Sequence, residues 1–280
     1  MQLAILVLLM GWLYSSILAR LVAQWWHDPN FSHGFFVPLF SLLVIWQTRS
    51  RLVSVPLRPS WVGLPLMIVA LSVLVVGVLG AELFLSRVSL LLVIAALIVF
   101  FLGWQSFRAV LFPWAFLILM IPIPAILFNQ ITFPLQLLTS KVASGVLPVI
   151  GVPVLREGNV ITLPAMSLEV AEACSGIRSL LSLVALSIIY GYLLEKRNSI
   201  RVLLALASVP IAVAANSLRI VGTGLLVQYW DPDKAEGFFH LFSGWLIFVV
   251  SMILLLLLHQ IFCWIWDRED SDLSEDEAEA

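Results

Sequence analysis

Charged residues are scarce in this sequence. Asp, Glu, Lys and Arg make up only 11% of its 280 residues, whereas 61% are hydrophobic. Water-soluble domains carry about 25% charged and about 45–50% apolar residues. Because the excess apolar surface cannot all be placed in a larger core, the composition argues against a soluble protein and predicts a chain that faces lipid. Basic runs interleaved with aromatic residues are also lacking, so nucleic-acid binding has no support.

Cysteine is nearly absent, with only Cys174 and Cys263 in the chain. They fall on opposite sides of the membrane in the topology predicted below, so a disulfide between them is not expected. His259 lies four residues before Cys263, but two residues do not make a metal site, and packing in the helix core is the favoured interpretation. We therefore expect neither a metal nor a cofactor.

Long apolar runs dominate the chain instead. A transmembrane helix needs about 20 predominantly apolar residues. No charged region precedes the first run, which is interpreted as a retained helix rather than a cleaved signal. The pattern predicts an all-α, polytopic membrane helix bundle of about eight helices in the lipid bilayer, without a soluble domain. The predicted spans are residues 3–22, 34–48, 61–80, 86–103, 109–128, 175–194, 202–227 and 240–264.

The predicted transmembrane domain covers residues 1–266 and leaves a cytoplasmic tail at residues 267–280. This tail holds eight acidic residues and one arginine. Short segments of such composition are usually solvated and disordered. We therefore expect a disordered tail, with a docking role as the alternative.

Basic residues predict the orientation, because cytoplasmic loops are enriched in Lys and Arg. They cluster in three alternate loops, near residues 49–58, at Arg108 and near residues 196–201. Both termini then lie in the cytoplasm of a multi-pass membrane protein. Arg20 and Arg87 are exceptions, because each lies alone near the outer end of a predicted span.

The longest outer connection covers residues 129–174. Its first part, through Ile150, is apolar and predicts an interfacial or re-entrant helix. Its second part contains short runs rich in β-branched residues at 152–156, 159–163 and 167–171, separated by turn residues. These runs predict a small extracytoplasmic β element that leads into Cys174.

Cys174 is the first candidate for chemistry. It follows Glu172 and begins the sixth predicted span. In the first turn of a helix, the dipole favours a thiolate, and Arg178, four residues on, can add positive charge on the same face. The alternative is a small buried apolar residue, because cysteine packs well in cores.

Arg219 lies inside the seventh predicted span. An arginine in the apolar layer costs several kcal/mol, about 2.5–3.5 on translocon scales, so we expect it to face the bundle interior near Asn216, one turn earlier. The alternative is snorkelling to the outer interface. A cation at this depth could stabilise an oxyanion or a thiolate.

His240 opens the eighth predicted span at the outer boundary, where a histidine can exchange protons near neutral pH. His27 and His33, in the first outer loop, compete for the same role, and position alone does not choose among the three. Cys174, Arg219 and His240 fall in one layer on consecutive helices. A thiol, a proton-transfer group and a fixed cation are the parts needed for acyl transfer through a thioester.

Four segments resemble motifs of the exosortase/archaeosortase family. EACSGIRSL at residues 172–180 resembles its cysteine motif, and NSLRI at 216–220 its arginine motif. HLFSGW at 240–245 resembles its histidine motif, and SHGFFVP at 32–38 resembles its N-terminal region. The resemblance covers residues 20–265, nearly the whole predicted membrane part.

The resemblance implies a transpeptidase of the cytoplasmic (inner) membrane that acts on the extracytoplasmic side. Its substrates would be membrane-anchored proteins that end in a sorting signal: a short motif such as Pro-Glu-Pro, a transmembrane helix and a basic end. Cys174 would be the nucleophile, Arg219 the electrostatic stabiliser and His240 the proton-transfer residue, and an acceptor nucleophile would resolve the thioester. Arg178 matches a motif position without an assigned role, and any activity of the C-terminal domain that some members carry must come from elsewhere.

Two other functions remain as alternatives. A transporter would line a proton or anion path with Arg219 and His240. It predicts polar residues continuing to the cytoplasmic side, where spans six and seven are nearly all apolar. A scaffold for envelope assembly would tolerate loss of Cys174.

Overall fold

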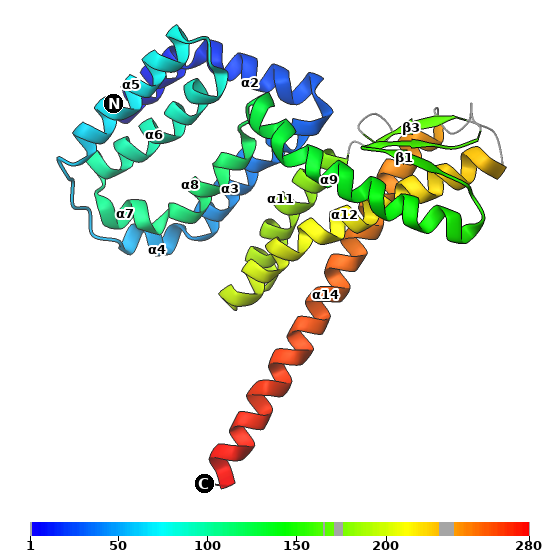
Figure 1. Ribbon diagram of the computed structural model, residues 1–280. Helices are drawn as coiled ribbons and strands as arrows, with labels where there is room; N and C mark the ends of the chain where they lie inside the picture. Colours follow the sequence, from blue (N-terminus) through cyan, green and yellow to red (C-terminus); the bar gives the residue numbers. More distant parts are fainter. Residues whose placement is uncertain (1, 165, 171–175, 230–237, 280) are drawn as a thin grey trace. The chain divides into compact units, whose positions relative to one another are not determined.

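The computed structural model describes residues 2–164, 166–170, 176–229 and 238–279 of the chain (Figure 1). The chain separates into two compact units, Met1–Ala125 and Ile126–Ala280, and each is described by itself. Apolar helices make up most of both units. The all-α membrane helix bundle predicted from composition is therefore the observed fold class.

The first unit is a set of helices organised around the pair α5 and α6. Gly63 and Gly77 of α5 let the two helices approach closely, because an added Cβ would lie 2.5 Å from Phe100 and 2.7 Å from Ser86. The elements are α1 (Gln2–Leu13), α2 (Ser15–His27), the 3₁₀ helix η1 (Pro29–Phe35), α3 (Phe36–Gln47), α4 (Arg49–Ser54), α5 (Gly63–Leu79), α6 (Leu83–Phe101), α7 (Trp104–Ala109), α8 (Leu111–Phe116) and η2 (Leu117–Met120).

The second unit begins with a long helix and a small sheet. Helix α9 (Ala125–Val146) and η3 (Leu147–Ile150) lead into strands β1 (Leu155–Glu157), β2 (Val160–Thr162) and β3 (Ser167–Glu169). The strands form an antiparallel meander in which Ile161 pairs with Arg156 on one side and with Leu168 on the other. The predicted β element is confirmed, with strands of three residues each.

The sheet packs on one end of a long helix. Ile161 and Leu168 turn inward and share a buried cluster with Leu147 of η3 and with Ile220 and Val227 of α12 (Asn198–Tyr229). Alternation of side chains across a strand explains why Ile161 is buried while its neighbour Thr162 is exposed. The sheet is thereby fixed to the half of α12 that carries Arg219.

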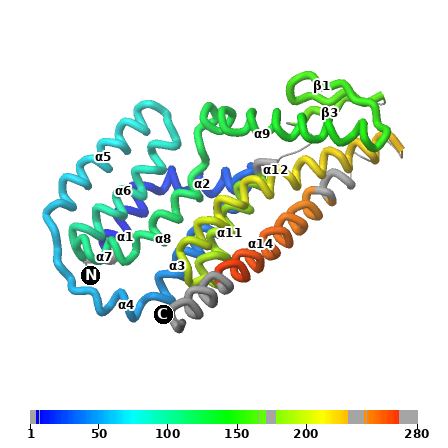
Figure 2. Tube along the Cα trace, turned by 60° about the horizontal axis from the view of Figure 1, so that its bottom comes forward, coloured from blue at the N-terminus to red at the C-terminus, as the bar shows by residue number. Residues whose placement is uncertain are grey.

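Helices α11 (Gly176–Leu194), α12 and α14 (Phe238–Glu279) pack together as a bundle in the second unit (Figures 1 and 2). Their shared core consists of the buried residues Leu183, Ile200, Leu204, Ala212 and Leu255. Short connections make successive helices antiparallel neighbours. The connection between α11 and α12 therefore lies at the Asn198 end of α12, at the other end of that helix from Tyr229.

Among the described residues, five helical segments are long and apolar enough to cross a membrane, and three apolar helices are shorter. Four of the five coincide with predicted spans, whereas Ala125–Ile150 covers the part of the outer connection that was predicted to be an interfacial or re-entrant helix. The other differences from the eight predicted spans have local causes. The first predicted span is divided at Tyr14 into α1 and α2, and the fifth is broken near its prolines, as expected. The five are Pro29–Gln47, Leu83–Phe101, Ala125–Ile150, Asn198–Tyr229 and Gly244–Trp266; the shorter ones are Gly63–Leu79, Leu111–Met120 and Arg178–Leu194.

Helix α14 is assigned through Glu279, and its described side chains end at Trp266. The boundary between a membrane domain ending at residue 266 and a disordered acidic tail thus remains a prediction.

Candidate functional site

The predicted site residues divide into those that the structure describes and those that it does not. Cys174 and Glu172 lie outside the described residues, and His240 is described only by its backbone in α14. Arg219, Asn216 and Arg178 belong to the second unit, and His33 belongs to the first.

Arg219 is buried in α12, with 6% of its surface exposed. Asn216 and Ser217 beside it are also buried, and the Ser217 hydroxyl donates a hydrogen bond to the Val213 carbonyl at 2.9 Å, within its own helix. Arg219 therefore faces the protein interior, as expected, and snorkelling along a lipid-facing surface does not describe it.

A glycine on the neighbouring helix makes room for the Arg219 guanidinium. A Cβ built on Gly244 of α14 would lie 3.6 Å from Arg219 Nη2 and 3.7 Å from its Cζ. The guanidinium thus lies against the backbone of this glycine, and a long side chain at residue 244 would displace the guanidinium. His240 belongs to the same helix one turn earlier, so the arginine and histidine motifs meet where α12 and α14 pack together.

Arg178 is in the first turn of α11, four residues after Cys174 in sequence. Its side chain is half-buried, and its Nε has no hydrogen-bond partner among the described residues. A buried guanidinium N–H is costly without an acceptor. This donor lies in the first described turn of α11 and is available to an anionic group.

His33 lies in η1, where its Nε2 is 3.1 Å from the Leu119 carbonyl oxygen. The Trp25 indole donates a comparable bond to the Met120 carbonyl at 2.9 Å. Pro122 lies three residues after Leu119 and Pro124 four residues after Met120, and neither proline has an N–H to donate to these carbonyls. His33 thus has a structural partner within its own unit.

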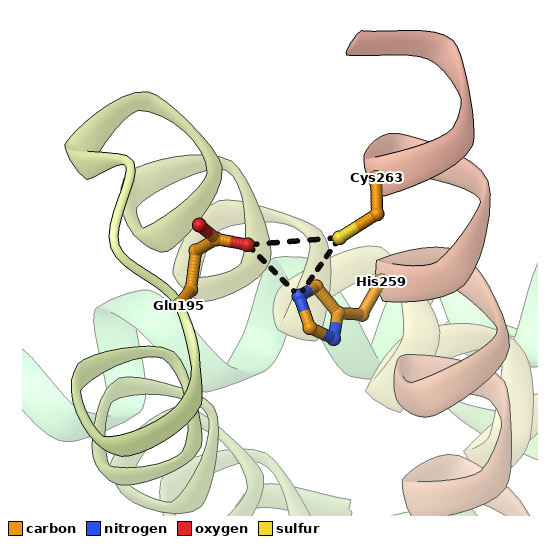
Figure 3. Close-up of side chains that lie close together, drawn as sticks. All are labelled: Glu195, His259 and Cys263. Carbon is orange, nitrogen blue, oxygen red and sulfur yellow. Dashed lines mark hydrogen bonds and ion pairs between the residues drawn. The ribbon is translucent and has the colours of Figure 1, made fainter. Parts of the chain in front are cut away.

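The structure brings together a second group of chemically active side chains that the sequence interpretation missed. Glu195 follows α11, and His259 and Cys263 lie one turn apart on α14 (Figure 3). His259 Nε2 is 3.1 Å from Glu195 Oε2 and 3.3 Å from Cys263 Sγ, and the sulfur is 3.6 Å from the same carboxylate oxygen. The other ring nitrogen of His259, Nδ1, is 2.7 Å from the Tyr190 hydroxyl.

The predicted topology held part of the signal for this group, namely the similar depth of its members, but not their contact. It places the connection after span six and the end of span eight on the same side of the membrane, which gives Glu195, His259 and Cys263 similar depth. Glu195 is also the one acid in a connection otherwise marked by Lys196 and Arg197.

Glu195 is held as a carboxylate. The backbone N–H of Arg197 lowers the pKa of Glu195 to about 2, with help from His259 and the N–H of Lys196, against desolvation that raises it. Charge-assisted bonds of this kind stabilise the ionised form of a carboxyl group. The cluster therefore has a fixed negative charge beside an imidazole and a thiol.

The model of the transmembrane exosortase family matches residues 25–257. The chain belongs to this family. No curated protein and no solved structure matches the chain.

The matched region of this exosortase includes Cys174, Arg219, His240 and His33. It ends before His259 and Cys263. Family membership therefore bears on the Arg219 end of the bundle and leaves the Glu195–His259–Cys263 cluster unassigned.

Proposed function

We propose that this exosortase is a cysteine transpeptidase that cleaves the C-terminal sorting signals of membrane-anchored proteins through a thioester on Cys174. The observation that carries the proposal is the burial of Arg219 against Gly244 of α14, one turn from His240. A desolvated cation beside the histidine motif is what stabilisation of an oxyanion requires. Membership in the exosortase family adds the expectation of a membrane-embedded protein substrate.

In the first half-reaction, the Cys174 thiolate attacks the carbonyl carbon of the scissile peptide bond. Arg219 stabilises the oxyanion that forms, and the His240 imidazolium protonates the leaving amine as the C–N bond breaks. The product is a thioester between Cys174 and the sorted protein. The transmembrane helix and basic end of the signal leave with the new amine.

In the second half-reaction, an acceptor nucleophile attacks the thioester carbonyl. His240, now neutral, takes the proton of the acceptor, and the Cys174 thiolate is the leaving group. Microscopic reversibility gives His240 both the acid and the base role. The acceptor replaces the cleaved signal and restores the enzyme.

The other site residues have supporting roles in this proposal. Glu172 and Arg178 set the charge around Cys174, and Asn216 packs one turn from Arg219. His33 orders the first outer segment rather than transferring protons, because its Nε2 is engaged by the Leu119 carbonyl. The reaction takes place at the outer face of the inner membrane, with both termini in the cytoplasm.

A transporter is less well supported than an enzyme. The apolar core around Leu183, Leu204 and Leu255 lies between Arg219 and Glu195 along the bundle. The buried serine hydroxyls at this depth, such as Ser208, donate to carbonyls of their own helix. Among the described residues, this layer separates the Arg219 end from the Glu195 end.

The two cysteines provide a matched test. A reporter that ends in Pro-Glu-Pro, an apolar span and basic residues is expressed with the wild-type enzyme, with Cys174→Ala or with Cys263→Ala. Cys174→Ala should leave the precursor uncut in membranes, whereas Cys263→Ala should process it. A stalled intermediate of the wild type should release the reporter on hydroxylamine treatment, which cleaves thioesters.

Continued processing of the reporter by the Cys174→Ala variant would rule out a mechanism through a thioester on Cys174. It would also favour the scaffold, because a scaffold tolerates loss of this residue.

A further inference from the structure

The Glu195–His259–Cys263 cluster takes no part in the proposed reaction, yet it gathers three different ligand types at one point. The carboxylate comes from the connection between α11 and α12, and the imidazole and sulfur come from consecutive turns of α14 (Figure 3). The side chains of His259 and Glu195 are only 13% and 11% exposed. Carboxylate, imidazole and thiolate are the groups that bind Zn²⁺ in proteins.

The spacing of the three atoms fits one face of a tetrahedral zinc site. Zinc bonds of about 2.0–2.3 Å at a tetrahedral angle place ligand atoms about 3.4–3.6 Å apart. The observed separations are 3.1 Å between Oε2 and Nε2, 3.3 Å between Nε2 and Sγ, and 3.6 Å between Sγ and Oε2. Each is within about 0.3 Å of the expected value, so an ion could enter with little movement of the side chains.

Tyr190 orients the histidine from the opposite side. Its hydroxyl is 2.7 Å from Nδ1, and the two rings meet edge to face. When the Nδ1–H donates to this hydroxyl, Nε2 is left with its lone pair directed at the cluster. Zinc-bound histidines are commonly fixed in this way by a partner on the other nitrogen.

The same geometry argues against a second catalytic triad. In a triad, the acid binds the ring nitrogen opposite to the one that accepts the nucleophile's proton. Here Glu195 and Cys263 both approach Nε2, and Nδ1 belongs to Tyr190. Three donor atoms that converge on one point describe a binding site for a cation rather than a proton relay.

We propose that Glu195, His259 and Cys263 bind a Zn²⁺ ion that ties the α11–α12 connection to α14, with water at the fourth position. Binding would join two segments that are 64 residues apart and would release the Cys263 thiol proton to solvent. The site is independent of the proposed peptidase: either one can fail without the other.

Cobalt provides the most direct test, because a Co²⁺–thiolate bond gives a charge-transfer absorption in the near ultraviolet. The full chain is purified in detergent, its affinity tag is removed, and it is titrated with Co²⁺ and then with Zn²⁺. We expect a single Co²⁺ per chain, the thiolate band, and displacement of Co²⁺ by Zn²⁺. The band should vanish in Cys263→Ser and remain in Cys174→Ser.

Variants of the proposed ligands and of Tyr190 should differ in how strongly they weaken Zn²⁺ binding. Glu195→Gln and His259→Gln should weaken Zn²⁺ binding more than Tyr190→Phe, for which a loss of about 10- to 100-fold is expected from removing a second-sphere partner. Zn²⁺ should raise the thermal unfolding temperature of the wild type and not that of Cys263→Ser. A folded wild type that binds neither metal, or a thiolate band that survives in Cys263→Ser, would overturn the proposal.

Discussion

The two ends of the α11–α12–α14 bundle use similar residue types with opposite charge. One end has a buried arginine, Arg219, beside the helix that carries His240; the other has a carboxylate, Glu195, beside His259 and Cys263. Arg219 lies 21 residues after Asn198, the first residue of α12, or about 32 Å along the helix at 1.5 Å per residue. The apolar core around Leu204 lies between them.

The sign of the fixed charge decides what each end can do. A buried cation favours a thiolate and a developing oxyanion, so the Arg219 end suits acyl transfer. A fixed carboxylate beside a thiol and an imidazole favours a bound cation, so the Glu195 end suits a metal. A cysteine and a histidine alone therefore do not define the function of either end. The charged residue beside them, Arg219 or Glu195, does.

The largest difference in processing rate between the two ends of the bundle is expected when each histidine is replaced by alanine. His240→Ala should slow processing of the sorting-signal reporter by about 100- to 10,000-fold, the usual contribution of a general acid–base residue. His259→Ala, at the other end of α14, should leave processing near the wild-type rate. Quantitative immunoblots of precursor and product in membranes provide the measurement.

His33 sharpens the choice of histidine. His33→Ala removes the bond to the Leu119 carbonyl and should lower the thermal stability of the protein while retaining most of the processing activity. If His33→Ala is inactive at wild-type stability and His240→Ala is active, the assignment of the proton-transfer role is reversed.

Arg219 should produce the next largest effect. Arg219→Gln removes the charge but keeps a polar side chain, and processing should fall by about 100- to 1,000-fold, as for loss of an oxyanion donor. Arg219→Lys keeps the charge without the planar fork and should retain more activity. The control is Arg156→Gln, because Arg156 lies on the sheet and donates to the Gly158 carbonyl. Equal rates for Arg219→Gln and the wild type would show that the buried cation has no catalytic part.

Gly244 tests the packing that positions the cation. Gly244→Ala should be tolerated, because its Cβ would make ordinary contact with the guanidinium at 3.6 Å. Gly244→Leu should push Arg219 aside and slow processing by about 10- to 100-fold, since displacements of about 1 Å cost that much in a positioned site. Gly222→Leu is the matched control, because no atom lies within 4 Å of a Cβ built there. Processing by Gly244→Leu at the rate of Gly222→Leu would argue against this contact.

The burial of Arg219 could be predicted from the sequence for a physical reason. An arginine in an apolar helix has few stable environments, so its burial follows from the cost of exposing it to lipid. Likewise, short β-branched runs between turn residues predicted the three-stranded sheet. The residue order alone also placed Arg219 and His240 near the same boundary.

The Glu195 end could not be derived in the same way. His259 and Cys263 are helical neighbours and were expected to pack in the core, and their third partner is 64 residues earlier in the chain. That contact depends on how tightly α11 and α14 approach, which apolar periodicity does not specify. The division of the first predicted span at Tyr14 was also missed, because no proline lies near it.

The smallest expected effect concerns acid stability at the Glu195 end. The folded-state pKa of Glu195, about 2, is below its ordinary value of 4.5, so the carboxylate stabilises the fold above about pH 4.5 and loses this contribution as the pH falls toward 2. In metal-free protein, the unfolding temperature of the wild type should fall more steeply between about pH 5 and pH 3 than that of Glu195→Gln, by a few degrees. Glu157→Gln is the control, because Glu157 is an exposed strand residue. Parallel pH curves for the wild type and Glu195→Gln would mean that the bonds from Arg197 and His259 do not stabilise the carboxylate. The charge contrast between the two ends of the bundle would then rest on Arg219 alone.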